Sequence, residues 1–241
     1  MIVSIEEEYK SFLDDKRVAL VGPSASTVLS GNGKTIDSYD VVVRLNRALP
    51  ISRNRADDIG TRTDVLYHSF QTTLGPEKEI DEDLWIMCGV KYLCAVTHRD
   101  FGRNGLQNGV NAVKKYQIKW MDRDVFGRLD CHIISYANAG TWAIQDLLSY
   151  PIKELHIFGI DFMRHGYDPE YYKNDPAGWE MYKDIESIRK TNGYHNVNGH
   201  FPDSQYQWFK NHVYGKDKRV KIEKYFEDML NDPNYDSLYE G

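Results

Sequence analysis

The sequence has 241 residues, of which 41% are hydrophobic and 27% charged, enough for one substantial core and too few for two full-sized ones. We therefore predict a single domain over residues 1–241. The formal net charge of -6 argues against nucleic acid or an anionic membrane as the main partner. Three cysteines without close pairing and no apolar run near the roughly 20 residues of a bilayer span favour a cytoplasmic protein, peripheral to a membrane at most.

The first predicted strand covers residues 18–22, an apolar run that leads into Pro23 and a hydroxyl-rich loop. A second run, rich in β-branched residues, lies at 41–46. The gap of about twenty residues between the two runs suits a crossover between parallel strands. Weaker strand signals follow at residues 65–68, 84–87 and 91–96.

The second half of the chain predicts a strand at 131–135, a helix at 140–149 and a strand at 154–160, which together form a βαβ unit. Strands that alternate with helices predict an α/β fold: a Rossmann-like, three-layer α/β/α arrangement with a mainly parallel sheet. In such folds ligands bind at the carboxyl ends of the strands.

The segment 163–200 has no clean period, so we expect a long functional loop with one helix near 179–189. Apolar positions within 204–213 fall on one helical face, and Asp203 or Ser204 is the expected cap.

Small and polar residues follow the first two predicted strands. Gly22 and Ser24 would let backbone N–H groups and a hydroxyl reach a phosphate or ribose, although a plain tight turn explains them equally well. Arg44 and Asn46 share one face of the second strand by its period of two. A buried guanidinium needs a partner, either a ligand or a structural ion pair with Asp58 or Asp64.

A third candidate is the junction at 138–141, where the predicted helix begins. The free N–H groups and the positive dipole end of a helix suit an anion. The candidate residues are Asn138, Ala139, Gly140 and Thr141.

Histidines gather late in the chain, at His165, His195 and His200. Imidazole can accept a proton from an attacking hydroxyl or hydrogen-bond a leaving phosphate near neutral pH. A competing signal is Asp122 with Asp124, an acidic pair of the kind that holds a metal with a nucleotide diphosphate.

Taken together, the segments 18–24, 31–33, 36–40, 43–48 and 58–63 resemble, in order and spacing, the long motif of the sialyltransferases, glycosyltransferase family 29. The stretch from Tyr136 through Gly140 to Asp161 resembles the short motif of that family. The later histidines resemble its two small C-terminal motifs in composition and position.

The resemblance implies a sialyltransferase-type variant of the GT-A fold and an inverting displacement without a metal cofactor. The donor would be a CMP-activated sialic acid or related keto-sugar, and the acceptor a glycan hydroxyl. Gly22, Ser24, Arg44, Asn46 and Asp161 would join the 138–141 junction in holding the donor.

Among the histidines, the resemblance implies that His200 or His195 is the general base and that His165 assists departure of the phosphate. We prefer His200 because it directly precedes the predicted helix at 204–213. The family usually has Asn where Pro23 stands, and its His-x4-Glu pattern is met here only as His195-x4-His200 or His200-x4-Gln205.

Two other hypotheses about the function remain open at this point. One is a metal-dependent transferase that uses a UDP- or GDP-sugar through Asp122 and Asp124. The other is a non-catalytic protein that binds nucleotide sugars. The sequence leaves the oligomeric state unknown.

Overall fold

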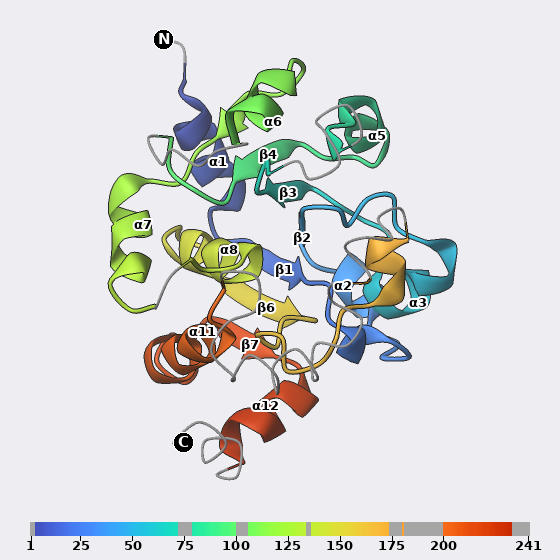
Figure 1. Cartoon of the computed structure of the whole chain (residues 1–241), viewed down its shortest axis with the longest axis vertical. Helices are drawn as coiled ribbons and strands as arrows, with labels where there is room; N and C mark the ends of the chain where they lie inside the picture. The colour runs from blue at the N-terminus through green and yellow to red at the C-terminus, as the bar shows by residue number, and fades with distance from the viewer. Residues whose placement is uncertain are drawn as a thin grey trace.

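The computed structural model describes residues 3–71, 79–99, 106–133, 136–173, 180 and 200–232. Within them, seven strands form one sheet in the order β5-β4-β3-β2-β1-β6-β7, and every neighbouring pair is parallel (Figure 1). The strands are β1 (Arg17–Val21), β2 (Val41–Leu45), β3 (Val65–His68), β4 (Tyr92–Ala95), β5 (Ile118–Lys119), β6 (Glu154–Phe158) and β7 (Val220–Ile222). The predicted α/β class with a parallel sheet is confirmed.

Helices flank this sheet and connect its strands. The α-helices are α1 (Ile5–Leu13), α2 (Gly33–Asp37), α3 (Ala56–Ile59), α5 (Glu82–Met87), α6 (Leu106–Ala112), α7 (Arg123–Asp130), α8 (Ala139–Leu148), α11 (Pro202–Trp208) and α12 (Lys224–Asn231). Three short 3-10 segments and one π-helical segment complete the described part: η1 (Ala25–Thr27), η2 (Arg53–Arg55), η3 (Pro169–Tyr172) and η4 (Phe209–Val213). No helix among these residues has the length and hydropathy to cross a membrane.

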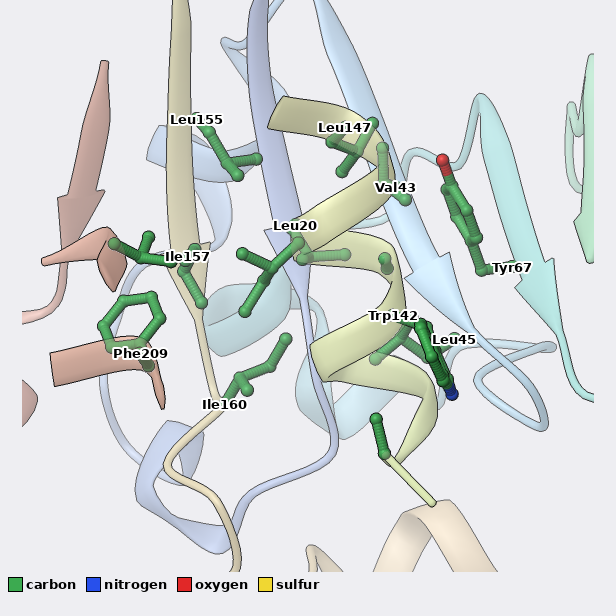
Figure 2. Packing of buried hydrophobic residues seen from close by; sticks show 14 of the residues in the cluster. Leu20, Val43, Leu45, Tyr67, Trp142, Leu147, Leu155, Ile157, Ile160 and Phe209 are labelled. Atoms are coloured by element: carbon green, nitrogen blue, oxygen red, sulfur yellow. The ribbon is translucent and has the colours of Figure 1, made fainter. Parts of the chain in front are cut away.

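Successive side chains of each strand point to opposite faces of the sheet. Leu20 of β1 packs beneath α8, against the cluster that contains Trp142 and Leu147 (Figure 2). Its neighbour Ala19 belongs to the other face and packs with Ile36 of α2. Burial of a large apolar side chain contributes about 1.5–3 kcal/mol relative to exposure. This period of two explains why strands covered on both faces read as continuous apolar runs.

A buried polar cluster lies on the α8 side of the sheet. The ammonium of Lys119 on β5 pairs with the carboxylate of Asp146 on α8, and the two side chains are 1% and 0% exposed. The Tyr67 hydroxyl donates to the same Asp146 oxygen, at 2.5 Å. The pair is closed off from water, so it belongs to the packing of the fold.

The carboxyl ends of β1 and β6 meet where the strand order reverses. The chain passes from β1 to β2 on one side, whereas β6 pairs with β1 on the other. Ligands of open α/β sheets bind in the crevice at such a switch point. Gly22 fits here because a Cβ on it would lie only 2.4 Å from the carbonyl oxygen of Gly159.

Several boundaries differ from the sequence-based expectation. Residues 82–87 form helix α5, not a strand at 84–87, because Asp81 caps the helix by accepting from the Leu84 N–H. The prediction of a strand at 131–135 is wrong for residues 131–133, the part that the structure describes, because they form a turn after α7.

Helix α11 begins at Pro202, and its N-cap is Phe201 with no side-chain cap. The expected cap by Asp203 or Ser204 is therefore wrong. Proline suits a first helical turn because its missing N–H has no intrahelical acceptor to lose. The helix expected near 179–189 lies outside the described residues, except for Glu180.

Candidate functional site

A cavity opens at the carboxyl ends of β1, β2 and β6, and we call it the switch-point cavity. Eight of the residues predicted from the sequence line it. They are Ser24, Asn46, Asn138, Ala139, Gly140, Asp161, His165 and His200. Residues separated by more than a hundred positions are thus brought to one place, which the sequence motifs alone could only suggest.

The N-terminus of helix α8 forms one wall of this cavity. Asn138 is the N-cap, and its side-chain oxygen accepts from the Thr141 N–H at 2.9 Å. Ala139 and Gly140 open the helix, so their N–H groups have no intrahelical acceptor. A Cβ on Gly140 would come within 3.2 Å of Ile160, so the glycine also lets the helix approach the end of β6 closely. The wall therefore suits an anion, as predicted.

Thr141 has a different position from its three neighbours. It is fully buried and lies behind the cavity wall. Its hydroxyl donates to the side-chain oxygen of Gln205 at 2.6 Å. In this structure it fastens α8 to α11.

A buried carboxylate organises the loop after β6. Asp161, 2% exposed, accepts from the Ser24 hydroxyl at 2.8 Å and from the backbone N–H of His165 at 3.2 Å. The same oxygen lies 2.8 Å from His165 Nδ1. This hydrogen bond raises the pKa of His165 above its usual value, because the carboxylate stabilises the imidazolium. His165 is therefore a half-exposed ring, held in place and biased toward the charged form.

His200 is oriented by an uncharged partner. Its Nδ1 lies 2.9 Å from the carbonyl oxygen of Tyr136, and a carbonyl can only accept. Nδ1 is thus the protonated nitrogen, and in the neutral ring Nε2 is the basic one. The third predicted histidine, His195, lies outside the described residues.

Arg44 and Gly22 line a second cavity instead, which shares Pro23, Asn46 and Tyr171 with the first. Arg44 is 1% exposed, and its guanidinium donates to the carbonyl oxygens of Arg62 and Ile59. Burial lowers its pKa to about 10. The ion pair considered with Asp58 or Asp64 is not formed.

Asn46 lies between the two cavities. Its backbone has φ of 46°, a left-handed conformation that asparagine tolerates better than most residues. Its Oδ1 accepts from the Ser69 N–H at 2.8 Å, which leaves Nδ2 as the group that a ligand would meet.

Arg55 joins three segments around the site, and sequence reasoning missed it. Its guanidinium pairs with Asp58 of α3 and, at 2.6 Å, with Asp168 just before η3. It also donates to the Thr27 hydroxyl at 2.9 Å. The segment from His165 to Asp168 is thereby fastened to the loop after β1. The sequence shows four arginines close together, at positions 44, 47, 53 and 55, but this spacing does not indicate which partners Arg55 has.

A second layer comes from the C-terminal segment. Glu223 accepts from the Gly159 N–H at 2.7 Å and from the Asn32 side chain at 2.9 Å. The hydroxyl of Tyr225 lies 2.7 Å from that of Ser26. Sequence reasoning missed both residues, because nothing in their neighbourhood signals proximity to the loops after β1 and β6.

The acidic pair at 122–124 lies elsewhere. Asp122 is the N-cap of α7, and its carboxylate accepts from the N–H groups of Asp124 and Val125. Neither aspartate lines the switch-point cavity or the second cavity. A capping role accounts for Asp122 without a ligand.

Comparison with known proteins identifies part of the chain. The sequence model of glycosyltransferase family 29 (sialyltransferase) matches residues 7–101. This match confirms the predicted resemblance and the prediction of a glycosyltransferase. A comparison with curated proteins gives no match.

A solved structure supports the fold assignment. A mammalian sialyltransferase is similar with a TM-score of 0.54 and 17% identity, over 87% of this chain and 69% of that one. At this identity the likeness establishes the fold alone. The sialyltransferase CstII from Campylobacter jejuni, in complex with the substrate analogue CMP-3FNeuAc, gives a TM-score of 0.48 and 13% identity over 86% of this chain and 78% of that one. This weaker likeness adds nothing to the fold assignment.

Proposed function

We propose that this chain transfers a sialic acid or related keto-sugar from a CMP-activated donor to a glycan hydroxyl, with inversion and without a metal ion. The observation that supports this most is the switch-point cavity. It combines the N-terminus of α8, the Asp161–His165 pair and His200. A displacement at a sugar phosphate needs a site for the phosphate, a base for the attacking hydroxyl and a group that stabilises the departing phosphate. The helix N-terminus and the two histidines could supply these three functions.

The donor phosphate would lie at the start of α8. The N–H groups of Ala139 and Gly140, with the positive end of the helix dipole, would hold its oxygens. Ser24 and the Nδ2 group of Asn46 would contact the nucleotide and the sugar from the ends of β1 and β2. The N–H groups and the helix dipole would thus take the place of a cation.

His200 would act as the general base. As the acceptor oxygen forms a bond to the anomeric carbon, its proton passes to His200 Nε2. The bond from that carbon to the phosphate oxygen breaks, and its electron pair leaves with CMP. His165, biased toward the imidazolium, would stabilise the departing phosphate. Base assistance of this kind contributes roughly 100- to 10,000-fold.

Calorimetry with CMP in the presence of EDTA tests the donor class and the metal together. We expect binding without a divalent ion. Binding that requires manganese would overturn the metal-free mechanism and return attention to Asp122 and Asp124. A chain that binds the nucleotide sugar but gives no product with any acceptor would favour the non-catalytic alternative.

A further inference from the structure

A chain of hydroxyl groups leads from helix α12 to the Asp161–His165 pair. Tyr225, in the first turn of α12, has its hydroxyl oxygen 2.7 Å from that of Ser26. The Ser26 oxygen lies 2.9 Å from that of Ser24, and the Ser24 hydroxyl donates to Asp161 at 2.8 Å. The Asp161 carboxylate in turn lies 2.8 Å from His165 Nδ1. A late segment of the sequence is thus connected to a histidine of the switch-point cavity.

The direction of these hydrogen bonds follows from the number of protons. A carboxylate can only accept, so the single hydroxyl proton of Ser24 is committed to Asp161. Ser26 must then donate to Ser24, and Tyr225 must donate to Ser26. Burial raises the pKa of Tyr225, so its hydroxyl keeps the proton with which the chain begins. Every bond of the chain therefore points toward the Asp161 carboxylate.

The ring of Tyr225 contacts the other member of the pair. Its centroid lies 5.7 Å from that of the His165 imidazole, and the two planes meet at 78°, an edge contact. Neither Tyr225 nor Ser26 lines the switch-point cavity. A residue that reaches both Asp161 and His165 from behind the cavity wall is suited to hold them in place, not to contact a ligand.

Glu223 is the other carboxylate close to this group, and it is bonded elsewhere. It accepts from the Gly159 N–H and from the Asn32 side chain. Burial raises the pKa of Glu223, and the nearby charge of Asp161 adds to this effect. Within the described part of the chain, the ion-pair partner of His165 is Asp161. The position of that one carboxylate therefore decides where the imidazole holds its proton.

We propose that Tyr225 is a positioning residue for His165, acting on Asp161 through Ser26 and Ser24 and on the imidazole through its ring. The inference rests on the proposed function, because it takes His165 to be the group that stabilises the departing phosphate. While Asp161 is held, His165 Nδ1 stays protonated in both charge states, which leaves Nε2 as the nitrogen that can meet a phosphate. Without the chain of hydroxyls, the carboxylate is free to turn away.

Tyr225→Phe tests the inference, because it removes the hydroxyl and keeps the ring. Nitrogen NMR of the imidazole above the pKa of His165 shows which ring nitrogen carries the proton, and it needs no substrate. We expect protonation at Nδ1 in the wild type and a shift toward Nε2 in the variant, because the acceptor is less well held.

The same variant should change the kinetics. Near neutral pH, kcat/KM should fall roughly 3- to 10-fold, as a small misplacement of a group that acts in the displacement predicts. The loosened pair lowers the pKa of His165 toward its ordinary value. Activity that needs the imidazolium should therefore be lost at lower pH in the variant than in the wild type.

Tyr214→Phe is the matched control. It removes the same group, a hydroxyl that donates to Glu227 of the same helix at 3.3 Å, outside the chain of hydroxyls. The NMR signal of His165 and kcat/KM should both stay at their wild-type values. Ser26→Ala breaks the chain from another element and should reproduce the effects of Tyr225→Phe, so the test does not depend on one variant.

The outcomes separate the two proposals. A proton that stays on His165 Nδ1 in both Tyr225→Phe and Ser26→Ala would overturn the role of Tyr225 alone. An active enzyme with a changed NMR signal but unchanged kcat/KM would overturn it as well. A wild-type chain that transfers no sialic acid or related keto-sugar from a CMP-activated donor would overturn the proposed function, and with it the part of Tyr225 in the reaction.

Discussion

Helix α8 contacts polar groups near both of its ends, and these groups are sealed from water at one end but line a cavity at the other. Toward its C-terminal end, Asp146 is neutralised by Lys119 and hydrogen-bonded by Tyr67, with the ion pair sealed from water. At its N-terminus, the cap is formed by neutral amides, and the groups opposite it include the half-exposed His165. The first arrangement is closed, and the second is open to a ligand. Buried polarity alone is thus a poor guide to function, whereas polarity that lines a cavity is a better one.

The largest effect on turnover should come from His200→Ala. Without the base at the open end of α8, turnover should fall by about two to four orders of magnitude, while CMP affinity stays within a few-fold. Steady-state kinetics and calorimetry measure the two quantities. If turnover stays near normal while His195→Ala abolishes it, the base has been assigned to the wrong histidine.

A smaller loss, of roughly 10- to 100-fold in turnover, should follow Asp161→Asn, because His165 would remain but lose its charge partner. The Asp161 carboxylate raises the pKa of His165. Activity that needs protonated His165 therefore persists to higher pH in the wild type and is lost as pH rises through that pKa. In the variant the pKa falls, so the loss should move to lower pH.

The pH dependence of kcat/KM measures this shift, and Ser24→Ala is the control that removes a hydrogen bond from Asp161 but no charge. An unchanged alkaline limb in Asp161→Asn would contradict the role of the pair.

Asn46→Asp should act on binding more than on chemistry. The Oδ1 bond to Ser69 and the left-handed backbone are compatible with aspartate. The nitrogen facing the ligand becomes a charged oxygen, so CMP affinity should fall roughly tenfold. The melting temperature should change little. A large fall in melting temperature with unchanged nucleotide affinity would indicate a purely structural asparagine.

At the closed end, Lys119→Met should leave CMP affinity unchanged per folded molecule. It should cost about 3–5 kcal/mol of stability, because Asp146 would be left buried and unpaired. Denaturant unfolding measures the loss, and Lys119→Met combined with Asp146→Leu should recover much of it. A loss of CMP affinity in the folded variant would contradict the distinction between the two ends.

The sequence predicts the central fold because its strands are buried on both faces. The run at 18–22 is continuous and apolar, and the run at 41–46 is rich in valine with Arg44 as its one buried charge. They correspond to β1 and β2. The prediction failed for α5, where the apolar residues 84–87 are too few to separate a strand from a helix and Asp81 decides in favour of the helix.

The site was partly predictable for a related reason. Glycine, serine and asparagine at strand ends mark the loops that line the cavity. Contacts between distant segments give no such local sign. Arg55 pairs with Asp168, which lies more than a hundred residues away in the sequence, and no local pattern predicts such a contact. Arg44 donates to backbone carbonyl groups, which are present at every residue, so the sequence does not indicate these partners.

The contacts of Glu223 and Tyr225 mean that the site is not contained in any one continuous stretch. Residues 7–101, which the family model matches, include Ser24 and Asn46 but neither Asp161 nor His200. A fragment ending before Glu223 would keep both histidines and still lose the carboxylate that accepts from Gly159. Nucleotide binding should therefore require that the whole sheet has formed, from β1 to β7, the last strand in the sequence.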